Sequence, residues 1–339
     1  MLYATTRSKT DTYTSYRTLH EDRAQDGGFF LPFKLPKFDA DQIVSFKNHS
    51  FGETVAEILN IFFSAGLTGW DVDCTIGKAA AKPIFMSHRV ILVQLWNNPA
   101  CNYQYICEKL FSKLTKDEGC TPTNWAKIAV RISVLFGIFS QLSSACNSFD
   151  ISVASGDFSV PMAAWYARQM GLPIGTIVCA CNENNAPWDF IHRGEMNTGI
   201  TVVHTLTPEL DIANPEELER LIFGTLGFEQ TAKYVEVSSR KGVYQIRPDM
   251  VKDINPGIFV SVVGRERIET VINSVYRSNQ CILDPVTAVA YGGLQDYRAK
   301  TGESNPTVLL WDNNPVRDYK LVNRATGLNQ DEIEKIINQ

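Results

Sequence analysis

The sequence has no concentration of basic residues. Its 339 residues include 32 Lys and Arg against 37 Asp and Glu, which gives a formal charge of -5, and no stretch gathers Lys and Arg into a stripe. A protein that neutralises a phosphate backbone needs such a stripe of positive charge. We therefore expect no nucleic-acid partner.

Long apolar runs are also absent. The most apolar stretch, residues 128–139, is short and contains Arg131, whereas a helix that spans a bilayer needs roughly 20 mostly apolar residues. This stretch predicts a buried core helix. The N-terminal segment lacks an apolar core followed by small residues, which is the pattern of a cleaved secretory signal. These features predict a cytoplasmic protein with no membrane association.

Dense cysteine spacing and metal-binding motifs are absent as well. Eight cysteines are scattered from position 74 to position 281 without paired CxxC motifs, and the five histidines form no HExxH motif. Cys179 and Cys181 share one face of a predicted strand, but two ligands do not fill a tetrahedral zinc site. We expect reduced, mostly buried thiols, no metal site and no catalytic histidine.

What the sequence does contain is a clear α/β unit in residues 149–181. FDISVAS is typical of a strand, GDFS of a loop, VPMAAWYARQM of a helix and GTIVCACN of a second strand. Such a unit forms a right-handed crossover between parallel strands. The loop 155–159 lies at a strand end and a helix start, where open α/β sheets bind ligands. Asp157, however, puts a carboxylate where an anion would bind.

Regular patterns on both sides of this unit complete the prediction. Residues 1–80 indicate a mainly helical N-terminal region that begins with a strand, MLYATT, and contains a helix that ends at Gly66. Asn214 and Pro215 predict the start of a further helix. No long linker separates residues 1–80 from residues 81–339. The other predicted elements are helices at 39–46, from 103 onward, 123–142, 266–278, 284–300 and 329–339, and strands at 90–96 and 306–311.

Four blocks of the sequence resemble the threonine synthase family. They are LYATTRS with AQDGGFFLPFKLPKF, ISVASGDFSVPMAAWYARQMGLPIGTIVCACNENN, TLTPELDIANPEELERLIF and DPVTAVAYGGLQDY, and they follow the family's order over most of the chain. The resemblance implies the tryptophan synthase beta-like fold of pyridoxal phosphate enzymes, in which a lysine forms a Schiff base with the cofactor. It further implies that residues 1–80 correspond to the family's N-terminal region. Residues 81–339 then form a reduced three-layer α/β lobe built on a parallel sheet.

The residues on which the family's chemistry depends are changed. Gln104 stands where the family motif LfHGPTlaFKD has its lysine, and an amide cannot form an imine. After Lys116 the chain passes directly to CTPTNWAKIAVRISVLFGIF, so the family block with TSGDTG, part of the lobe that covers the cofactor, is missing. The phosphate loop GNFGd has become GDFSV at residues 156–160. The segment GTAHPaKF has become WDNNPVRDY at residues 311–319.

These changes predict a catalytically degenerate threonine synthase-like protein with no catalytic residue, no cofactor and an interaction or regulatory role. Its expected partner is a second copy or an intact homologous enzyme, because a lost lobe would leave apolar surface that needs cover. Two alternatives stay open. One is a divergent pyridoxal phosphate-dependent lyase in which another lysine, such as Lys109, replaces the missing one. The other is a small-molecule binding protein that uses a residual pocket. The candidate pocket residues are Ser155, Gly156, Asp157, Asn182 and Asp312.

Overall fold

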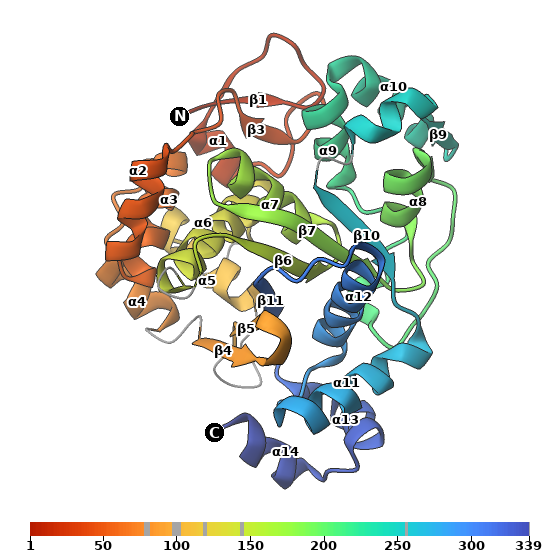
Figure 1. Cartoon of the computed structure of the whole chain (residues 1–339). Coiled ribbons are helices and arrows are strands. Elements are labelled where there is room, and N and C mark those ends of the chain that lie inside the picture. Colours follow the sequence, from red (N-terminus) through yellow and green to blue (C-terminus); the bar gives the residue numbers. More distant parts are fainter. Residues whose placement is uncertain (78–81, 97–102, 118–120, 143–145, 255–256, 339) are drawn as a thin grey trace.

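A computed structural model describes residues 1–77, 82–96, 103–117, 121–142, 146–254 and 257–338. Its centre is a six-stranded sheet with the strand order β10-β7-β6-β11-β5-β4 (Figure 1). Neighbouring strands run parallel except for β4, which pairs antiparallel with β5. The predicted α/β class is confirmed, although the sheet is mixed because the sequence analysis did not foresee β4. The strands are β4 (Lys82–Met86), β5 (Val90–Gln94), β6 (Phe149–Ala154), β7 (Ile174–Cys181), β10 (Ile258–Val262) and β11 (Thr307–Trp311).

Helices cover both faces of this sheet. Because side chains alternate along a strand, the residues of β7 face two separate apolar clusters: Cys179 and Cys181 face one cluster, and Val178 and Ala180 face the other. The first cluster includes helices α6 (Asn124–Leu142) and α7 (Ser159–Gln169), and the second includes α11 (Arg265–Asn279) and α12 (Pro285–Thr301). The lobe therefore has three layers, as predicted, and the two thiols are buried core groups.

The N-terminal region combines a small sheet with four helices. The sheet has the order β2-β1-β3, and capping boxes at Asp39, Ser50 and Thr68 start three of the helices. The helix over residues 51–63 ends at Ser64, whose φ of 53° already leaves the helical region, so the prediction that Gly66 ends it was wrong by two positions. The elements are β1 (Leu2–Thr5), β2 (Tyr13–Thr14), α1 (Ser15–His20), β3 (Phe30–Pro32), α2 (Ala40–Ser45), α3 (Phe51–Phe63) and α4 (Gly69–Ile76).

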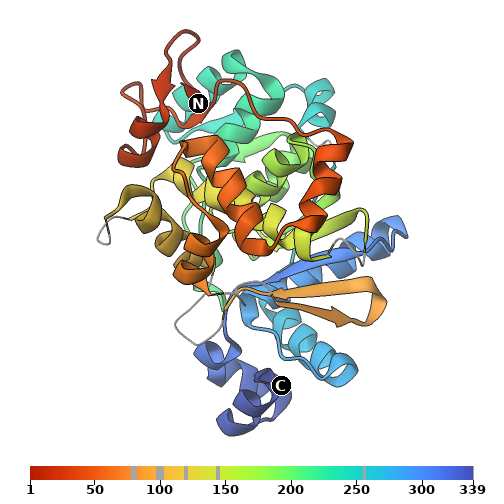
Figure 2. The same cartoon turned by 90° about the vertical axis from the view of Figure 1, so that its left-hand side faces the viewer.

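Helix α6 lies at the junction of the two regions and packs against α3. In Figure 2 the orange N-terminal helices lie against the yellow α6, and the blue C-terminal helices lie at the opposite end. Among the described residues, α6 is the one helix long and apolar enough to cross a membrane by length and composition, but 83% of its apolar window is buried inside the protein. Such burial is typical of a core helix. The predicted buried helix at 128–139 is confirmed.

An ion pair and a hydrogen bond join the N-terminal region to the larger lobe. Arg7 pairs with Glu219 at 2.7 Å, and Arg220 donates from Nη2 to the Phe30 carbonyl at 2.9 Å. Arg220 also pairs with Glu217, which precedes α9 (Leu218–Leu226) at its N-cap position. The predicted helix start at Asn214 and Pro215 was therefore too early. The Asn214 amide instead donates to the Thr198 carbonyl at 3.2 Å.

The remaining elements extend the lobe around this frame. Helix α5 precedes α6, and a two-stranded ribbon of β8 and β9 lies beside α8 and α10. The predicted C-terminal helices are confirmed, and an Asn329 capping box starts the last one. The elements are α5 (Tyr103–Thr115), α8 (Ala186–Arg193), β8 (Glu195–Asn197), α10 (Phe228–Ser239), β9 (Val243–Gln245), α13 (Tyr319–Thr326) and α14 (Gln330–Ile337), with short 3-10 helices η1 (Phe46–Asn48), η2 (Ser87–Arg89), η3 (Pro208–Leu210), η4 (Pro248–Asp253) and η5 (Pro315–Asp318).

Candidate functional site

A cavity of about 300 Å³ lies at the carboxyl ends of β6 and β11. This is the edge where an open parallel sheet presents loop residues to a ligand. The walls come from the first turn of α5, from α6, from the loop between β6 and α7, from η3 and from the segment after β11. The described lining residues are Gln104, Arg131, Ala154, Ser155, Gly156, Asp157, Ser159, Val160, Glu209, Leu210, Ile212, Val286, Asp312 and Asn313.

Four of the five predicted pocket residues line this one cavity. Ser155, Gly156 and Asp157 come from the β6–α7 loop, and Asp312 comes from the end of β11. Gln104, which the sequence analysis aligns with the family's lysine, also lines this cavity. The turn predicted at residues 97–99 lies outside the described residues. The fold thus brings together residues that are more than 200 positions apart, which the strand-end argument anticipated.

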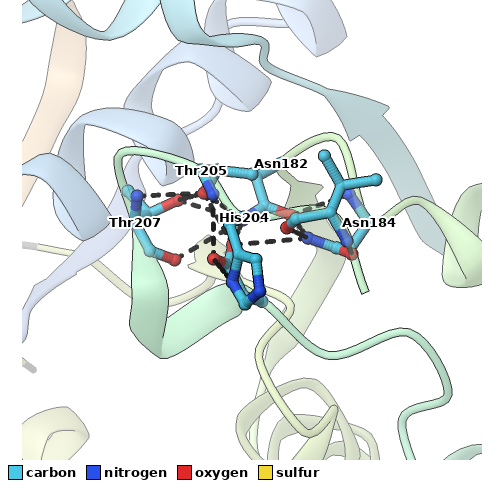
Figure 3. Close-up of polar contacts among 7 residues, drawn as sticks. Asn182, Asn184, His204, Thr205 and Thr207 are labelled. Atoms are coloured by element: carbon cyan, nitrogen blue, oxygen red, sulfur yellow. Dashed lines mark hydrogen bonds and ion pairs between the residues drawn. The ribbon is translucent and has the colours of Figure 1, made fainter. Parts of the chain in front are cut away.

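The fifth candidate, Asn182, does not line the cavity. Asn182 directly follows β7 and is fully buried. Its side chain forms hydrogen bonds to the loop that follows β8, as Figure 3 shows. Its Nδ2 donates to Thr205 Oγ1 at 2.9 Å and to Asp211 Oδ1 at 2.8 Å, while Asn184 donates to the Val203 carbonyl at 2.8 Å. These bonds hold the segment that leads into η3. Asn182 therefore reaches the cavity only indirectly, by positioning that segment.

The loop that these hydrogen bonds hold contains His204. His204 projects from the loop beside Thr205 (Figure 3), and its side chain is 94% exposed, with Nδ1 4.0 Å from an oxygen of Asp211. Such an exposed ring at that distance makes only a weak ion pair. Among the described residues, no group of three or more His, Cys, Asp or Glu is arranged to hold a metal.

The Asp157 carboxylate forms hydrogen bonds within the β6–α7 loop. Asp157 Oδ1 accepts hydrogen bonds from the Ser159 backbone N–H, at 2.9 Å, and from the Ser159 hydroxyl. Gly156 has a φ of +46°, and the buried Phe158 has a φ of +68°, in the left-handed region that non-glycine residues rarely adopt. The amide at the start of α7 is one that a bound anion would use. Here a side chain of the protein already occupies it.

Gln104 presents an amide to the cavity. The side chain is exposed, and its Nε2 donates to Glu108 Oε1 at 3.0 Å, one turn further along α5. No lysine is among the described residues of the cavity wall. Lys109, the replacement considered from the sequence, instead lines a separate cavity of about 770 Å³ between α5 and the α3–α4 loop, where Lys113 and Lys116 also lie.

Asp312 is the most perturbed carboxyl group of the site. Burial, helped by the nearby carboxylate of Asp284, raises its pKa from the usual 3.8 to about 8. Its Oδ1 is buried and has no hydrogen-bond partner within the protein. Asp284 caps α12 through the Val286 and Thr287 amides, and burial raises its own pKa to about 7. The two neighbouring carboxyl groups therefore titrate near neutrality.

Glu209 and Arg131 are cavity residues that the sequence analysis missed. Glu209 is held from two sides: Asn313 donates to Oε2 at 2.7 Å, and Arg317 lies 3.4 Å from Oε1. Arg131 comes from the core helix α6, and its charge lowers the pKa of Asp312. Neither residue has a local sequence signal, because the fold brings both from distant segments. The segment 311–319, which departs from the family pattern, was the one hint at Asn313 and Arg317.

Comparison with known sequences gives a consistent result. The family described as "Threonine synthase N terminus" matches residues 2–79. A threonine synthase from Pseudomonas aeruginosa is 29% identical over 225 residues, which cover 65% of this chain and 46% of that protein. The human protein named "Threonine synthase-like 1" is 29% identical over 176 residues, 49% of this chain and 24% of that protein. These alignments thus span less than half the length of the curated relatives.

Comparison with solved structures supports the same fold. The structure of pyridoxal phosphate-bound threonine synthase from Brucella melitensis superposes with a TM-score of 0.86 at 17% sequence identity, covering 98% of this chain and 94% of that one. At this identity the superposition establishes the shared architecture of the sheet, the helical layers and the N-terminal region. The chemistry of the cavity has to be argued from its own residues.

Proposed function

Because the chain belongs to the threonine synthase family, we propose that it is a catalytically degenerate member, a cytoplasmic pseudoenzyme that forms no covalent link to pyridoxal phosphate. The observation that carries the proposal is the Gln104 amide on the cavity wall, together with the lack of any lysine among the described lining residues. The nitrogen lone pair of an amide is delocalised into its carbonyl, so it cannot attack an aldehyde. The family's chemistry begins with that attack by a lysine amine.

The residues present also do not form a binding site for the phosphate group of the cofactor. In this fold a phosphate would rest on the amides at the start of α7, but the Ser159 amide donates to Asp157 at 2.9 Å. A phosphate brought there would face the Asp157 carboxylate at contact distance. Like charges in such close contact repel strongly in a partly buried site. The residues present therefore do not fit pyridoxal phosphate at either its aldehyde end or its phosphate end.

We also propose that the lobe that covers the cofactor in the family is largely missing here. Helix α5 ends at Thr115 and α6 begins at Asn124, so only residues 116–123 connect them. A strand–loop–helix unit needs far more chain than this connection provides. A cavity without such a cover would exclude water poorly, which is unfavourable for the reactive intermediates of this enzyme class.

The alternative proposal of a divergent lyase needs an amine that reaches the cavity. Lys109 is the nearest candidate in sequence, but it points to the separate cavity beside α4, with its Nζ 5.4 Å from the centre of the Tyr105 ring. A lyase would therefore require a rearrangement of α5. The pseudoenzyme proposal requires none, and we favour it for that reason.

The decisive experiment combines absorption spectroscopy with mass spectrometry. Purified protein is mixed with pyridoxal phosphate, its spectrum is recorded, and borohydride is added before the intact mass is measured. We expect no stable imine band and no stoichiometric adduct on a single lysine, whereas the Pseudomonas aeruginosa threonine synthase serves as the positive control. A single adduct that disappears in Lys109→Ala would overturn the proposal and support the lyase.

An interaction role is the function that remains for a degenerate member. We propose that the chain pairs with a second copy or with an intact homologous enzyme. Two exposed aromatic side chains support this: Trp70 on α4 is 72% exposed, and Phe85 on the edge strand β4 is 65% exposed. Exposed edge strands with apolar side chains readily pair with another chain. A monomer in light scattering at micromolar concentration that also fails to bind a homologous enzyme would contradict this role.

A further inference from the structure

The cavity at the ends of β6 and β11 carries three carboxyl groups from three separate segments. Asp157 accepts hydrogen bonds from Ser159. Glu209 accepts a hydrogen bond from Asn313 and forms an ion pair with Arg317. Asp312 is different: the residue lines the cavity, and its buried Oδ1 has no hydrogen-bond partner within the protein. A buried carboxyl oxygen without a hydrogen bond is unfavourable. The structure therefore leaves the Asp312 carboxyl group incompletely satisfied beside the space where a ligand would lie.

The electrostatic surroundings of that oxygen favour a positively charged donor. The charged groups that face Asp312 are Asp284 at the start of α12, Glu209 on η3 and Arg131 on α6. Arg317 offsets part of the charge of Glu209. With the carboxyl groups ionised, the lining is net negative, counting Asp157, Glu209 and Asp312 against Arg131. A cation that entered would exchange the repulsion among these groups for attraction.

We propose that this cavity binds a small organic ammonium compound, whose positively charged nitrogen donates to the Asp312 carboxylate. This rests on the proposed function, because a cofactor linked to a lysine would fill the same space. Aliphatic side chains supply the remaining wall, namely Ala154, Val160, Leu210, Ile212 and Val286. At about 300 Å³ the cavity is at the lower end of the range for small-molecule sites. The ligand is therefore a compact amine with an apolar body.

The same geometry selects against anions. A carboxylate or phosphate would need the amide of Ser159, which Asp157 holds, and it would meet the carboxyl groups of Asp312 and Glu209. The charge preference of the cavity is thus opposite to that of a phosphate-binding loop. Affinity for an amine increases as the pH rises through the pKa of Asp312, because the ionised carboxylate binds an ammonium group better than the neutral acid.

Three ring compounds of the same shape test the charge preference directly. Cyclohexylamine, cyclohexanol and cyclohexanecarboxylate differ only in one polar group, and an alkylamine stays protonated well above neutral pH, as the lysine side chain does. Binding is followed by NMR titration of the full-length protein. We expect the amine to bind at least tenfold more tightly than either of the other two. Its affinity should increase between pH 6 and pH 9.

Asp312→Asn should weaken amine binding at least tenfold and abolish its pH dependence. Asp249→Asn is the matched control, because Asp249 is an exposed carboxylate paired with Arg247 elsewhere; this variant should bind as the unmodified protein does. The inference is overturned if cyclohexylamine does not bind, if all three compounds bind equally, or if Asp312→Asn binds normally. A pyridoxal phosphate adduct in the mass assay would overturn the proposed function, whereas a lack of amine binding without any adduct overturns only this inference.

Discussion

The Asp157 carboxylate accepts a hydrogen bond from the backbone N–H of Ser159 at 2.9 Å, at the first residue of α7. The Asp157 side chain thereby satisfies the first amide of the helix and occupies the position that an anion would take. The positive end of the helix dipole is neutralised by the protein itself. This relationship separates the present cavity from a phosphate-binding loop, although both occupy the same place in the fold.

Removal of the charge at this position should restore some anion binding. Asp157→Asn keeps a side-chain oxygen that can accept from Ser159 but removes the negative charge. We expect inorganic phosphate to raise the melting temperature of this variant more than that of the unmodified protein, at equal ionic strength, because binding to the folded state stabilises it. Asp249→Asn serves as the charge control. Equal effects of phosphate on all three proteins would contradict the expectation.

The loss of these hydrogen bonds is a separate prediction. Asp157→Ala removes the acceptor for the Ser159 amide and hydroxyl, and a hydrogen bond within a protein typically contributes about 1 kcal/mol to stability. We expect the free energy of unfolding in urea to fall by roughly this amount, with an unchanged slope. A loss of several kcal/mol would indicate that the left-handed conformation of Phe158 depends on the Asp157 side chain as well.

The buried carboxyl groups predict a decline of stability with rising pH. The pKa of Asp312 is raised to about 8, so the folded state binds more protons than the unfolded state between about pH 4 and pH 8. Where the folded state binds the extra proton, the free energy of unfolding decreases as the pH rises. The side chain of Asp312→Asn cannot ionise, so the free energy of unfolding of this variant should decrease less as the pH rises. We expect urea titrations to show that the free energy of unfolding of the variant, relative to that of the unmodified protein, is higher at pH 8 than at pH 5. If both curves were parallel, the burial of Asp312 would be refuted.

A buried ion pair gives a sharper test of packing. Glu217 and Arg220 are fully buried, and Arg220 also bonds to the Phe30 carbonyl, which joins the N-terminal region to the lobe. Arg220→Met leaves Glu217 charged and unpaired, which should cost about 3–5 kcal/mol. The exposed pair of Arg240 and Glu236 is the control, and Arg240→Ala should cost less than about 0.5 kcal/mol. Similar losses in the two variants would show that the pair is not buried in solution.

Much of this fold could be predicted from the sequence because its signals are local. The unit at 149–181 has one apolar run per strand and a glycine-containing loop, and the structure contains it as β6, α7 and β7. The start of α9 was misplaced for a non-local reason, since Glu217 points inward to Arg220 and cannot be told from an ordinary first-turn acid. β4 was missed because it is a short edge strand without apolar alternation.

The candidate site was predictable only where residues follow a strand. Ser155, Gly156, Asp157 and Asp312 meet because parallel strands end at one edge of the sheet. Asn182 also follows a strand, but hydrogen bonds turn its side chain towards Thr205 and Asp211. The contribution of Glu209 depends on how the loop before α9 folds back. No local pattern encodes that path.

Gln104→Lys is the most direct test of the proposal that this chain lacks the family's chemistry. The side chain is exposed on α5, and lysine is as good a helix former as glutamine, so stability should change by less than about 0.5 kcal/mol. The introduced amine would stay protonated beside Glu108, which accepts from Gln104 at 3.0 Å, and would therefore be a poor nucleophile. We expect only a minor pyridoxal phosphate adduct after borohydride reduction. The double variant with Asp157→Asn should yield clearly more, because the phosphate no longer meets a carboxylate. A full adduct in the single variant would show that the lysine alone was missing, and that Asp157 does not exclude the cofactor.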